Sequence, residues 1–300
     1  MAGRDSVKPD RYAWLETRIE DRHWLPPRGG PSLGAIEYVP GNHERARLPH
    51  ARFASHPNVH VFDCARTFVV EIRGTPIAVA GFPYERSNVR SRFPDLLRQT
   101  GWEMEPAAHR MLCMHQCVEG ATVGPSDFTF TSGEDVLRLH DVPSEFRAVL
   151  AGHIHRHQVL ATDLRGRRLD APVIYPGAIE RTSIAEIDEP KGFMVVHVGE
   201  SGARWEFRRL PARPMVRKQV SVDGLNARML DSAIRAIVAG APSDAVLWIR
   251  LAGAVTDDHL RVVSARRMRA IAPSTMNVEL SFASLHPHTV RRSRPTAASR

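Results

Sequence analysis

The side chains with the clearest chemical potential in this sequence are one asparagine and four histidines, arranged in three short clusters. The first cluster is Gly41-Asn42-His43-Glu44, the second is centred on His115, and the third is Gly152-His153-Ile154-His155. Imidazole nitrogens bind manganese, iron, zinc and similar divalent ions. Each cluster alone has an ordinary explanation, since glycine and asparagine are common in turns and single histidines are more often structural. Together they predict a metal centre.

The spacing within these clusters suggests different roles for their members. His153 and His155 are two residues apart, so in a loop that leaves a strand they can point toward two neighbouring metal ions. Asn42 can offer its carbonyl oxygen to one ion while its amide nitrogen turns elsewhere. His43 is adjacent to that ligand, and we expect it to face a substrate phosphate instead of a metal ion.

Short apolar runs lead into the clusters and must position them. Residues 36–39 precede the first cluster, 111–114 precede His115, and 148–151 precede the third cluster. Runs of this length, bounded by Gly or Pro, are typical of buried strands. Ligands bind at the carboxyl ends of strands in open α/β sheets. The pattern therefore predicts a layered α/β domain with the clusters at its strand ends.

Other segments complete the predicted organisation. Helices are expected at 11–19 and 87–99, and further strands at 67–72, 77–81, 173–175, 193–198 and 204–208. A proline-bearing connector at 210–214 precedes a new pattern, with strands at 216–222, 246–251 and 278–282 and helices at 225–238 and from Thr256 or Asp257 to about 271. We predict a main domain over 1–211, a small α/β domain over 215–283, and a basic disordered tail over 284–300.

Composition restricts the class of protein further. The chain has 300 residues, of which 43% are hydrophobic and 25% charged, and three cysteines, too few for a disulfide framework. No segment approaches the roughly 20 apolar residues of a membrane helix, and the first residues lack the apolar core of a signal peptide. A cytoplasmic location is therefore expected. The net charge of +8 favours an anionic partner such as nucleic acid, although its richness in arginine can equally reflect a GC-rich genome.

The three clusters, in this order, resemble the later signature motifs of the calcineurin-like metallophosphoesterases. Within that superfamily the chain is most similar to the SbcD-type DNA repair exonucleases. The stretches that carry the resemblance are residues 39–45, 92–102, 114–116, 151–155 and 175–183. The resemblance implies a layered metallophosphoesterase sandwich over 1–211, followed by a small α/β capping domain over 215–283.

The resemblance also implies roles and partners. Asn42, His115 and His153 would hold one metal ion and His155 a second, with manganese as the preferred metal. His43 would orient or protonate the leaving oxygen, while two ions roughly 3.5–4 Å apart share the attacking hydroxide. The implied activity is metal-dependent hydrolysis of DNA phosphodiesters, by a homodimer that works with an SbcC-like ATPase subunit.

The chain departs from the family pattern at its N-terminus. The family has an Asp-x-His motif and a Gly-Asp motif on two strands upstream of Gly-Asn-His-Glu, and only 41 residues precede Asn42 here. Asp5 lies at about the right distance to be the metal-bridging aspartate of the Gly-Asp motif. Asp21-Arg22-His23 matches the letters of the Asp-x-His motif, but it follows a helix-like stretch and lies too near Asn42 to be that motif. We expect that translation begins upstream of Met1 or that the gene is truncated, and that the second ion binds weakly.

Three alternatives stay open at this point. Cys113 and Cys117 flank His115 and could form a thiolate zinc site, although a cysteine on a strand is commonly a small buried residue. The chain could be a superfamily phosphoesterase that acts on nucleotides or phosphoproteins. It could also be a truncated relative that only binds DNA or the ATPase partner, without hydrolysis.

Overall fold

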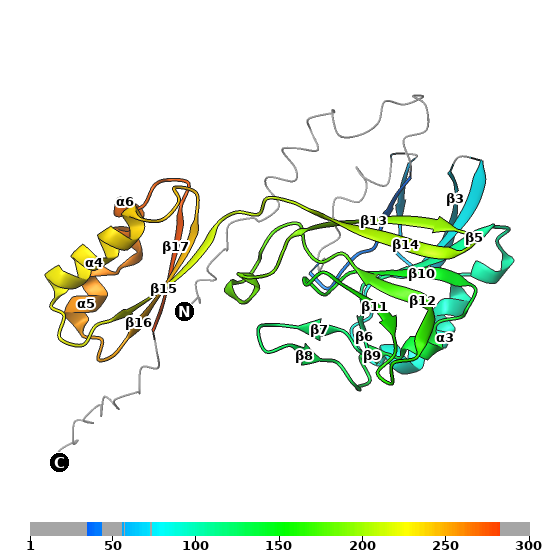
Figure 1. Ribbon diagram of the computed structural model, residues 1–300, viewed down its shortest axis with the longest axis horizontal. Helices are drawn as coiled ribbons and strands as arrows, with labels where there is room; N and C mark the ends of the chain where they lie inside the picture. The colour runs from blue at the N-terminus through cyan, green and yellow to red at the C-terminus, as the bar shows by residue number, and fades with distance from the viewer. Residues whose placement is uncertain (1–34, 44–55, 57, 73, 283–300) are drawn as a thin grey trace, which may run out of the picture.

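A six-stranded mixed sheet is the largest element of the computed structural model, which describes residues 35–43, 56, 58–72 and 74–282 (Figure 1). Its strand order is β11-β12-β10-β5-β4-β3. The four inner strands run parallel, and the two edge strands pair antiparallel to their neighbours. The strands are β3 Arg66–Ile72, β4 Thr75–Gly81, β5 His109–Met114, β10 Phe146–Ala151, β11 Gln158–Thr162 and β12 Arg168–Tyr175.

The inner strands are largely buried, because hydrophobic clusters pack against both faces of the sheet. Helix α3, Val89–Gln99, buries Val89, Phe93, Leu96 and Leu97 in the hydrophobic core of one face. The expected helix began two residues earlier, but Asn88 has a left-handed backbone with φ of 56° and stands outside the helix. The strand predictions for this sheet are confirmed, whereas strand β11 was not predicted.

The described residues also form two-stranded sheets, most of them short, apart from the main sheet. The pairs are β1 Ile36–Tyr38 with β2 Val59–Val61, β6 Cys117–Val118 with β9 Val136–Leu137, β7 Thr122–Val123 with β8 Phe128–Thr129, and β13 Gly192–Gly199 with β14 Gly202–Arg209. Three 3-10 helices, η1 Trp102–Met104, η2 Leu139–Asp141 and η3 Ile184–Glu186, lie in the connections. Strand β1, which leads into Asn42, therefore belongs to a separate two-stranded parallel sheet.

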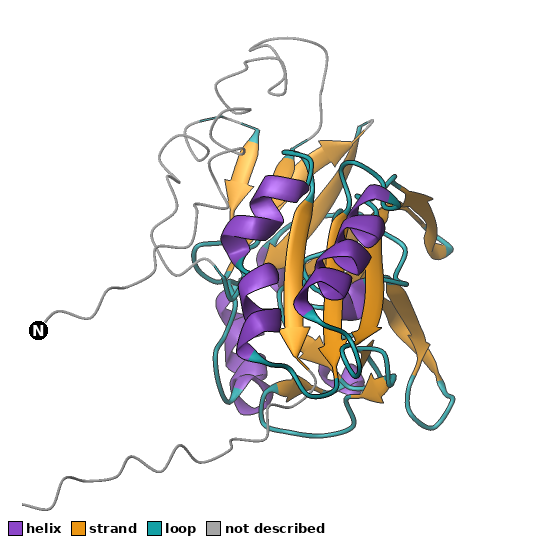
Figure 2. Ribbon diagram, turned by 90° about the vertical axis from the view of Figure 1, so that its left-hand side faces the viewer, coloured by secondary structure: helices purple, strands orange, loops and turns teal. Residues whose placement is uncertain are grey.

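A three-stranded parallel sheet with its own hydrophobic core follows the connector at 210–214. It contains β15 Met215–Ser221, β16 Val246–Ala252 and β17 Asn277–Phe282, in that order. Helices α4 Ala227–Ala239, α5 Asp257–Val262 and α6 Ala265–Ile271 cover one face of it, the face toward the viewer in Figure 2. The predicted strand and helix order is confirmed here, while the domain boundaries stay a prediction.

One predicted helix of this part is two helices in the structure. The expectation was a single helix from Thr256 or Asp257 to about 271. Thr256 does cap α5, but the hydroxyl of Ser264 accepts a hydrogen bond from the amide of Arg267 and begins α6. A serine at this position ends one helix and caps the next, since its side chain satisfies an amide that has no partner within the helix.

Arg213 fastens the connector to both of its neighbours. Its amide donates to Glu180 Oε2 at 2.9 Å, and its carbonyl accepts from Arg181 Nη1 at 3.1 Å. Its guanidinium donates to the carbonyls of Asp244 and Thr275, next to the second sheet. The connector is thus held by hydrogen bonds on both sides.

Several predictions fall outside this description. Asp5, the segment 21–23, the helix at 11–19 and the tail at 284–300 all lie outside the described residues. Among the helices that the structure describes, none is long and apolar enough to cross a membrane.

Candidate metal centre

Asn42, His115 and His153 converge on one point. His115 Nε2 lies 3.0 Å from Asn42 Oδ1, and His153 Nδ1 lies 3.3 Å from the same oxygen. The two imidazole rings meet edge to face with their centroids 5.2 Å apart. Two ring nitrogens therefore face one amide oxygen, although His115 lies 73 residues and His153 lies 111 residues from Asn42 in the sequence.

The main sheet brings the two histidines together. Met114 at the end of β5 pairs with Ala151 at the end of β10, so the residues that follow emerge side by side. Gly152 allows this approach, because a Cβ at that position would stand 2.7 Å from Nδ1 of His115. His153 itself has a left-handed φ of 83°, a strained conformation for a side-chain-bearing residue that often marks a functional site.

Asn42 reaches this point from the small sheet of β1 and β2. The amide of Tyr84, in the segment after β4, donates to the carbonyl of Pro40 at 3.0 Å and holds the loop that carries Asn42. The Tyr84 ring then stacks on His153 at 5.5 Å between centroids and meets His115 edge-on at 5.9 Å. The sequence analysis did not single out Tyr84, since an aromatic residue after a strand has no distinctive pattern.

Burial keeps these histidines neutral. It lowers the pKa of His115 to about 4, with further lowering from the nearby His153, His43 and His155. The pKa of His153 is also lowered by burial, and then by His155 and His43. Neutral imidazole is the form that binds metal ions, so both side chains are in the ligating form at pH 7.

His155 lies in a different environment from the other two. Its Nδ1 is 3.0 Å from Glu186 Oε1 and 3.1 Å from the Thr182 hydroxyl. Lys191, whose side chain is fully buried, donates to Glu186 Oε2 at 2.5 Å and to the carbonyl of His155 at 3.1 Å. Burial raises the pKa of Glu186, but hydrogen bonds from Lys191, His155 and Thr182 outweigh it and hold this pKa below its usual value.

The sequence analysis missed Glu186 and Lys191 as site residues. Lys191 is one of three lysines in an arginine-rich chain, a weak hint at most, and Glu186 lies three residues beyond the motif at 175–183. These partners lie 31 and 36 residues from His155 along the chain. Only the tertiary structure brings them to it.

A cavity of about 330 Å³ lies between Asn42 and His153 on one side and His155 and Glu186 on the other, whereas His115 does not line it. His43, His153 and His155 line it, together with charged side chains. The other polar lining residues are Asn42, Arg156, Ser183, Glu186 and Glu189.

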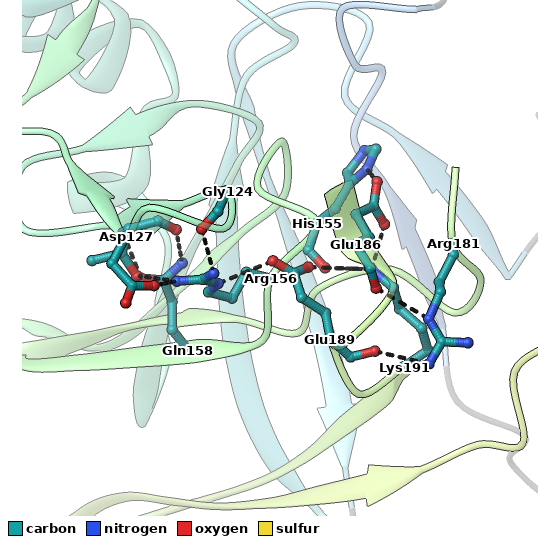
Figure 3. Close-up of polar contacts among 10 residues, drawn as sticks. Gly124, Asp127, His155, Arg156, Gln158, Arg181, Glu186, Glu189 and Lys191 are labelled. Atoms are coloured by element: carbon teal, nitrogen blue, oxygen red, sulfur yellow. Dashed lines mark hydrogen bonds and ion pairs between the residues drawn. The ribbon is translucent and has the colours of Figure 1, made fainter. Parts of the chain in front are cut away.

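Arg156 fixes one wall of the cavity to the hairpin of β7 and β8 (Figure 3). It donates to Glu189 Oε1 at 3.1 Å, to Asp127 Oδ1 at 2.5 Å and to the carbonyl of Gly124 at 2.7 Å. These carboxylates raise the pKa of Arg156, with the hydrogen bond to Asp127 as the largest cause. The wall therefore carries a fixed cation with its partners already in place.

The donor set fits one divalent ion. The two imidazole nitrogens and the amide oxygen are ligand types that manganese, iron and zinc accept. Over the part of the chain that the structure describes, no group of three or more His, Cys, Asp or Glu side chains is placed to hold a metal ion; the converging set here has two histidines and an amide. His155 lies beside this set, and Asp5 lies outside the described residues.

The two cysteines near His115 do not favour a thiolate site. Cys113 is buried on β5, and burial raises its pKa to about 12. Burial likewise raises the pKa of Cys117 to about 11. Both thiols are held protonated, whereas zinc binds the thiolate.

No protein family matches the chain in a comparison with known families, and no curated protein matches it either. The resemblance to the metallophosphoesterases therefore rests on the sequence motifs and stays a prediction.

Proposed function

We propose that this chain is a metal-dependent phosphodiesterase, a DNA exonuclease subunit of the calcineurin-like superfamily. One observation carries the proposal: Asn42 Oδ1, His115 Nε2 and His153 Nδ1 meet within about hydrogen-bonding distance. These are the three side chains that the motifs assign to a single ion. Ordinary turn chemistry gives no reason for them to converge from three separate strand ends.

Each side chain has a distinct role in the proposed site. Asn42, His115 and His153 would hold one ion, and His155 would contribute to a second, for which Asp5 is the further carboxylate proposed from the sequence. A bound divalent ion lowers the pKa of its water and neutralises charge on the phosphate. His43, an exposed residue at the cavity rim, faces the phosphate and orients or protonates the leaving oxygen.

The finer parts of the proposal rest on the motifs and the charge. They are a layered metallophosphoesterase sandwich, a capping domain over 215–283, manganese as the metal, DNA as substrate, an SbcC-like ATPase partner, a homodimer and a cytoplasmic location. The net charge of +8 supports an anionic substrate.

The test compares metal binding and hydrolysis in the wild type with three variants. His153→Ala and Asn42→Ala remove ligands, while His140→Ala removes an exposed histidine outside the site. We expect the first two variants to weaken manganese binding by more than about tenfold, because loss of a ligand should cost at least as much as loss of a group that hydrogen-bonds to a ligand. His140→Ala should leave the affinity for manganese unchanged. Titration calorimetry measures this without any substrate.

Hydrolysis then separates the possible activities. Degradation of DNA ends with manganese supports the exonuclease. Cleavage of a small aryl phosphodiester without DNA degradation identifies another phosphoesterase of the superfamily. Salt-dependent DNA binding with no hydrolysis under any metal identifies a binding protein. Manganese affinity that is the same in the wild type and in His153→Ala would refute the metal site itself.

A further inference from the structure

The Nδ1 atom of His155 lies between two oxygens. Glu186 Oε1 is 3.0 Å away and the hydroxyl oxygen of Thr182 is 3.1 Å away. The same hydroxyl donates its hydrogen to Glu186 Oε1 at 2.8 Å. A hydroxyl has one hydrogen, so its oxygen presents lone pairs to the imidazole.

These contacts decide which ring nitrogen carries the proton. A carboxylate is only an acceptor, and the hydroxyl hydrogen is already used. A lone pair on Nδ1 would face two acceptor oxygens without a hydrogen between them. Nδ1 of His155 must therefore be protonated, which in the neutral ring leaves Nε2 with the lone pair.

Lys191 keeps this arrangement in place. It binds the far carboxylate oxygen of Glu186 at 2.5 Å, and its side chain is 0% exposed. It also donates to the carbonyl of His155 at 3.1 Å, which accepts a second bond from the amide of Ala178 at 3.1 Å. One buried cation thus holds the backbone of His155 directly and its imidazole through Glu186 (Figure 3).

We propose that Glu186, fixed by Lys191 and Thr182, is a positioning residue that sets the tautomer and ring orientation of His155, with Nε2 left as the ligand nitrogen. The tautomer follows from the hydrogen bonds alone. Its use to hold the second ion rests on the proposed function. Carboxylates that orient metal-binding histidines in this way raise the basicity of the ligand and the affinity for metal.

Glu189 provides a matched control for Glu186. It lines the same cavity, is as buried as Glu186, and has its Oε2 3.6 Å from Lys191 Nζ. It has no contact with the His155 imidazole among those found in the structure. Loss of charge near Lys191 is therefore common to Glu186→Gln and Glu189→Gln, whereas loss of the acceptor for His155 is specific to Glu186→Gln.

The experiment records long-range ¹H–¹⁵N correlation spectra of the metal-free chain labelled in its histidine rings, with His155 assigned by its loss in His155→Asn. The wild type is expected to show a protonated Nδ1 and a bare Nε2. In Glu186→Gln, Lys191 retains the amide oxygen, so the amide nitrogen turns toward His155 and the proton moves to Nε2. Glu189→Gln is expected to keep the wild-type pattern.

Metal titration gives a second readout. Glu186→Gln should weaken the second, weaker manganese site by about 10–100-fold, while Glu189→Gln stays close to the wild type. If Glu186→Gln does not fold, the double variant Glu186→Gln with Lys191→Met is measured instead, because it removes both charges of this buried pair. Its His155 signal is expected to be a mixture of tautomers, because the free amide can present either end.

Two results would overturn the proposal. One is a wild-type His155 with the proton on Nε2. The other is an equal change of tautomer in Glu186→Gln and Glu189→Gln, which would assign the effect to charge in the cavity. Because these spectra contain no metal and no substrate, they stand whether or not the chain proves to be a phosphodiesterase.

Discussion

Replacement of Lys191 by methionine should be among the most destabilising single substitutions in this chain. The lysine side chain is fully buried and that of Glu186 is 10% exposed. Removing one partner of a buried ion pair leaves an uncompensated charge and costs about 3–5 kcal/mol. Glu186 would still have His155 and Thr182 as partners, so we place the loss at the lower end, about 3 kcal/mol.

Urea unfolding followed by far-UV circular dichroism measures this loss. With an m value of about 2–3 kcal/mol/M, a loss of about 3 kcal/mol lowers the midpoint of the affected transition by about 1 M or more. The exposed Lys218 provides the control, because Lys218→Met should change stability by less than about 0.5 kcal/mol.

A double variant separates the charge from the packing. In Glu186→Gln with Lys191→Met no charge of this pair remains, and replacement of a whole buried pair is often nearly neutral. We expect the double variant to recover at least about half of the loss. A free energy of unfolding for Lys191→Met within about 1 kcal/mol of the wild-type value would refute the reasoning, since burial of the Glu186 carboxylate without its cation would then cost little.

Three further predictions concern other parts of the chain. Gly152→Ala should push His115 out of place, since the new Cβ would stand 2.7 Å from Nδ1, and should weaken manganese binding in calorimetry, whereas Gly199→Ala, with no atom within 4 Å, should not. The pKa of His115 is lowered to about 4 in the folded chain, from its ordinary value of 6.5. Between pH 4 and 6.5 the unfolded chain therefore binds more protons at this residue than the folded chain does. The metal-free protein should therefore lose stability as pH falls from 6.5 toward 4, and His115→Asn should flatten this dependence in denaturant titrations. Of the three thiols, only the exposed Cys64 should react with a thiol reagent in the native protein; fast labelling of all three would contradict the burial described above.

The positions of the candidate ligands could be predicted because they depend on local pattern. An apolar run followed by a polar cluster marks a strand end, and neighbouring parallel strands end at one edge of a sheet. This reasoning placed His115 and His153 correctly beside each other, just after the ends of β5 and β10. It did not foresee that Asn42 arrives from a separate two-stranded sheet. Asn42, His115 and His153 meet at one point, whereas His155, expected with them, has Glu186 and Thr182 as its partners.

The groups that orient the ligands could not be predicted in the same way. Glu186, Lys191 and Tyr84 follow no spacing rule relative to the histidines, because their contacts depend on how loops fold over the sheet. The break between α5 and α6 was missed for a related reason: Ser264 is compatible with a helix interior or with a cap, and packing decides between them. Asp5 lies outside the described residues and stays a prediction.

The hydrogen bonds of Arg213 have a mechanical consequence. These bonds tie the connector to Glu180 and Arg181 on one side and to the carbonyls of Asp244 and Thr275 on the other, which restricts rotation of the three-stranded sheet about the connector. Load on that sheet can reach Glu180 and Arg181 and also Ile184, whose carbonyl accepts from Arg217 of β15. Arg181 in turn donates to the carbonyl of Glu186 at 3.1 Å. A pull on the three-stranded sheet would therefore reach the backbone of Glu186, the residue whose carboxylate contacts His155.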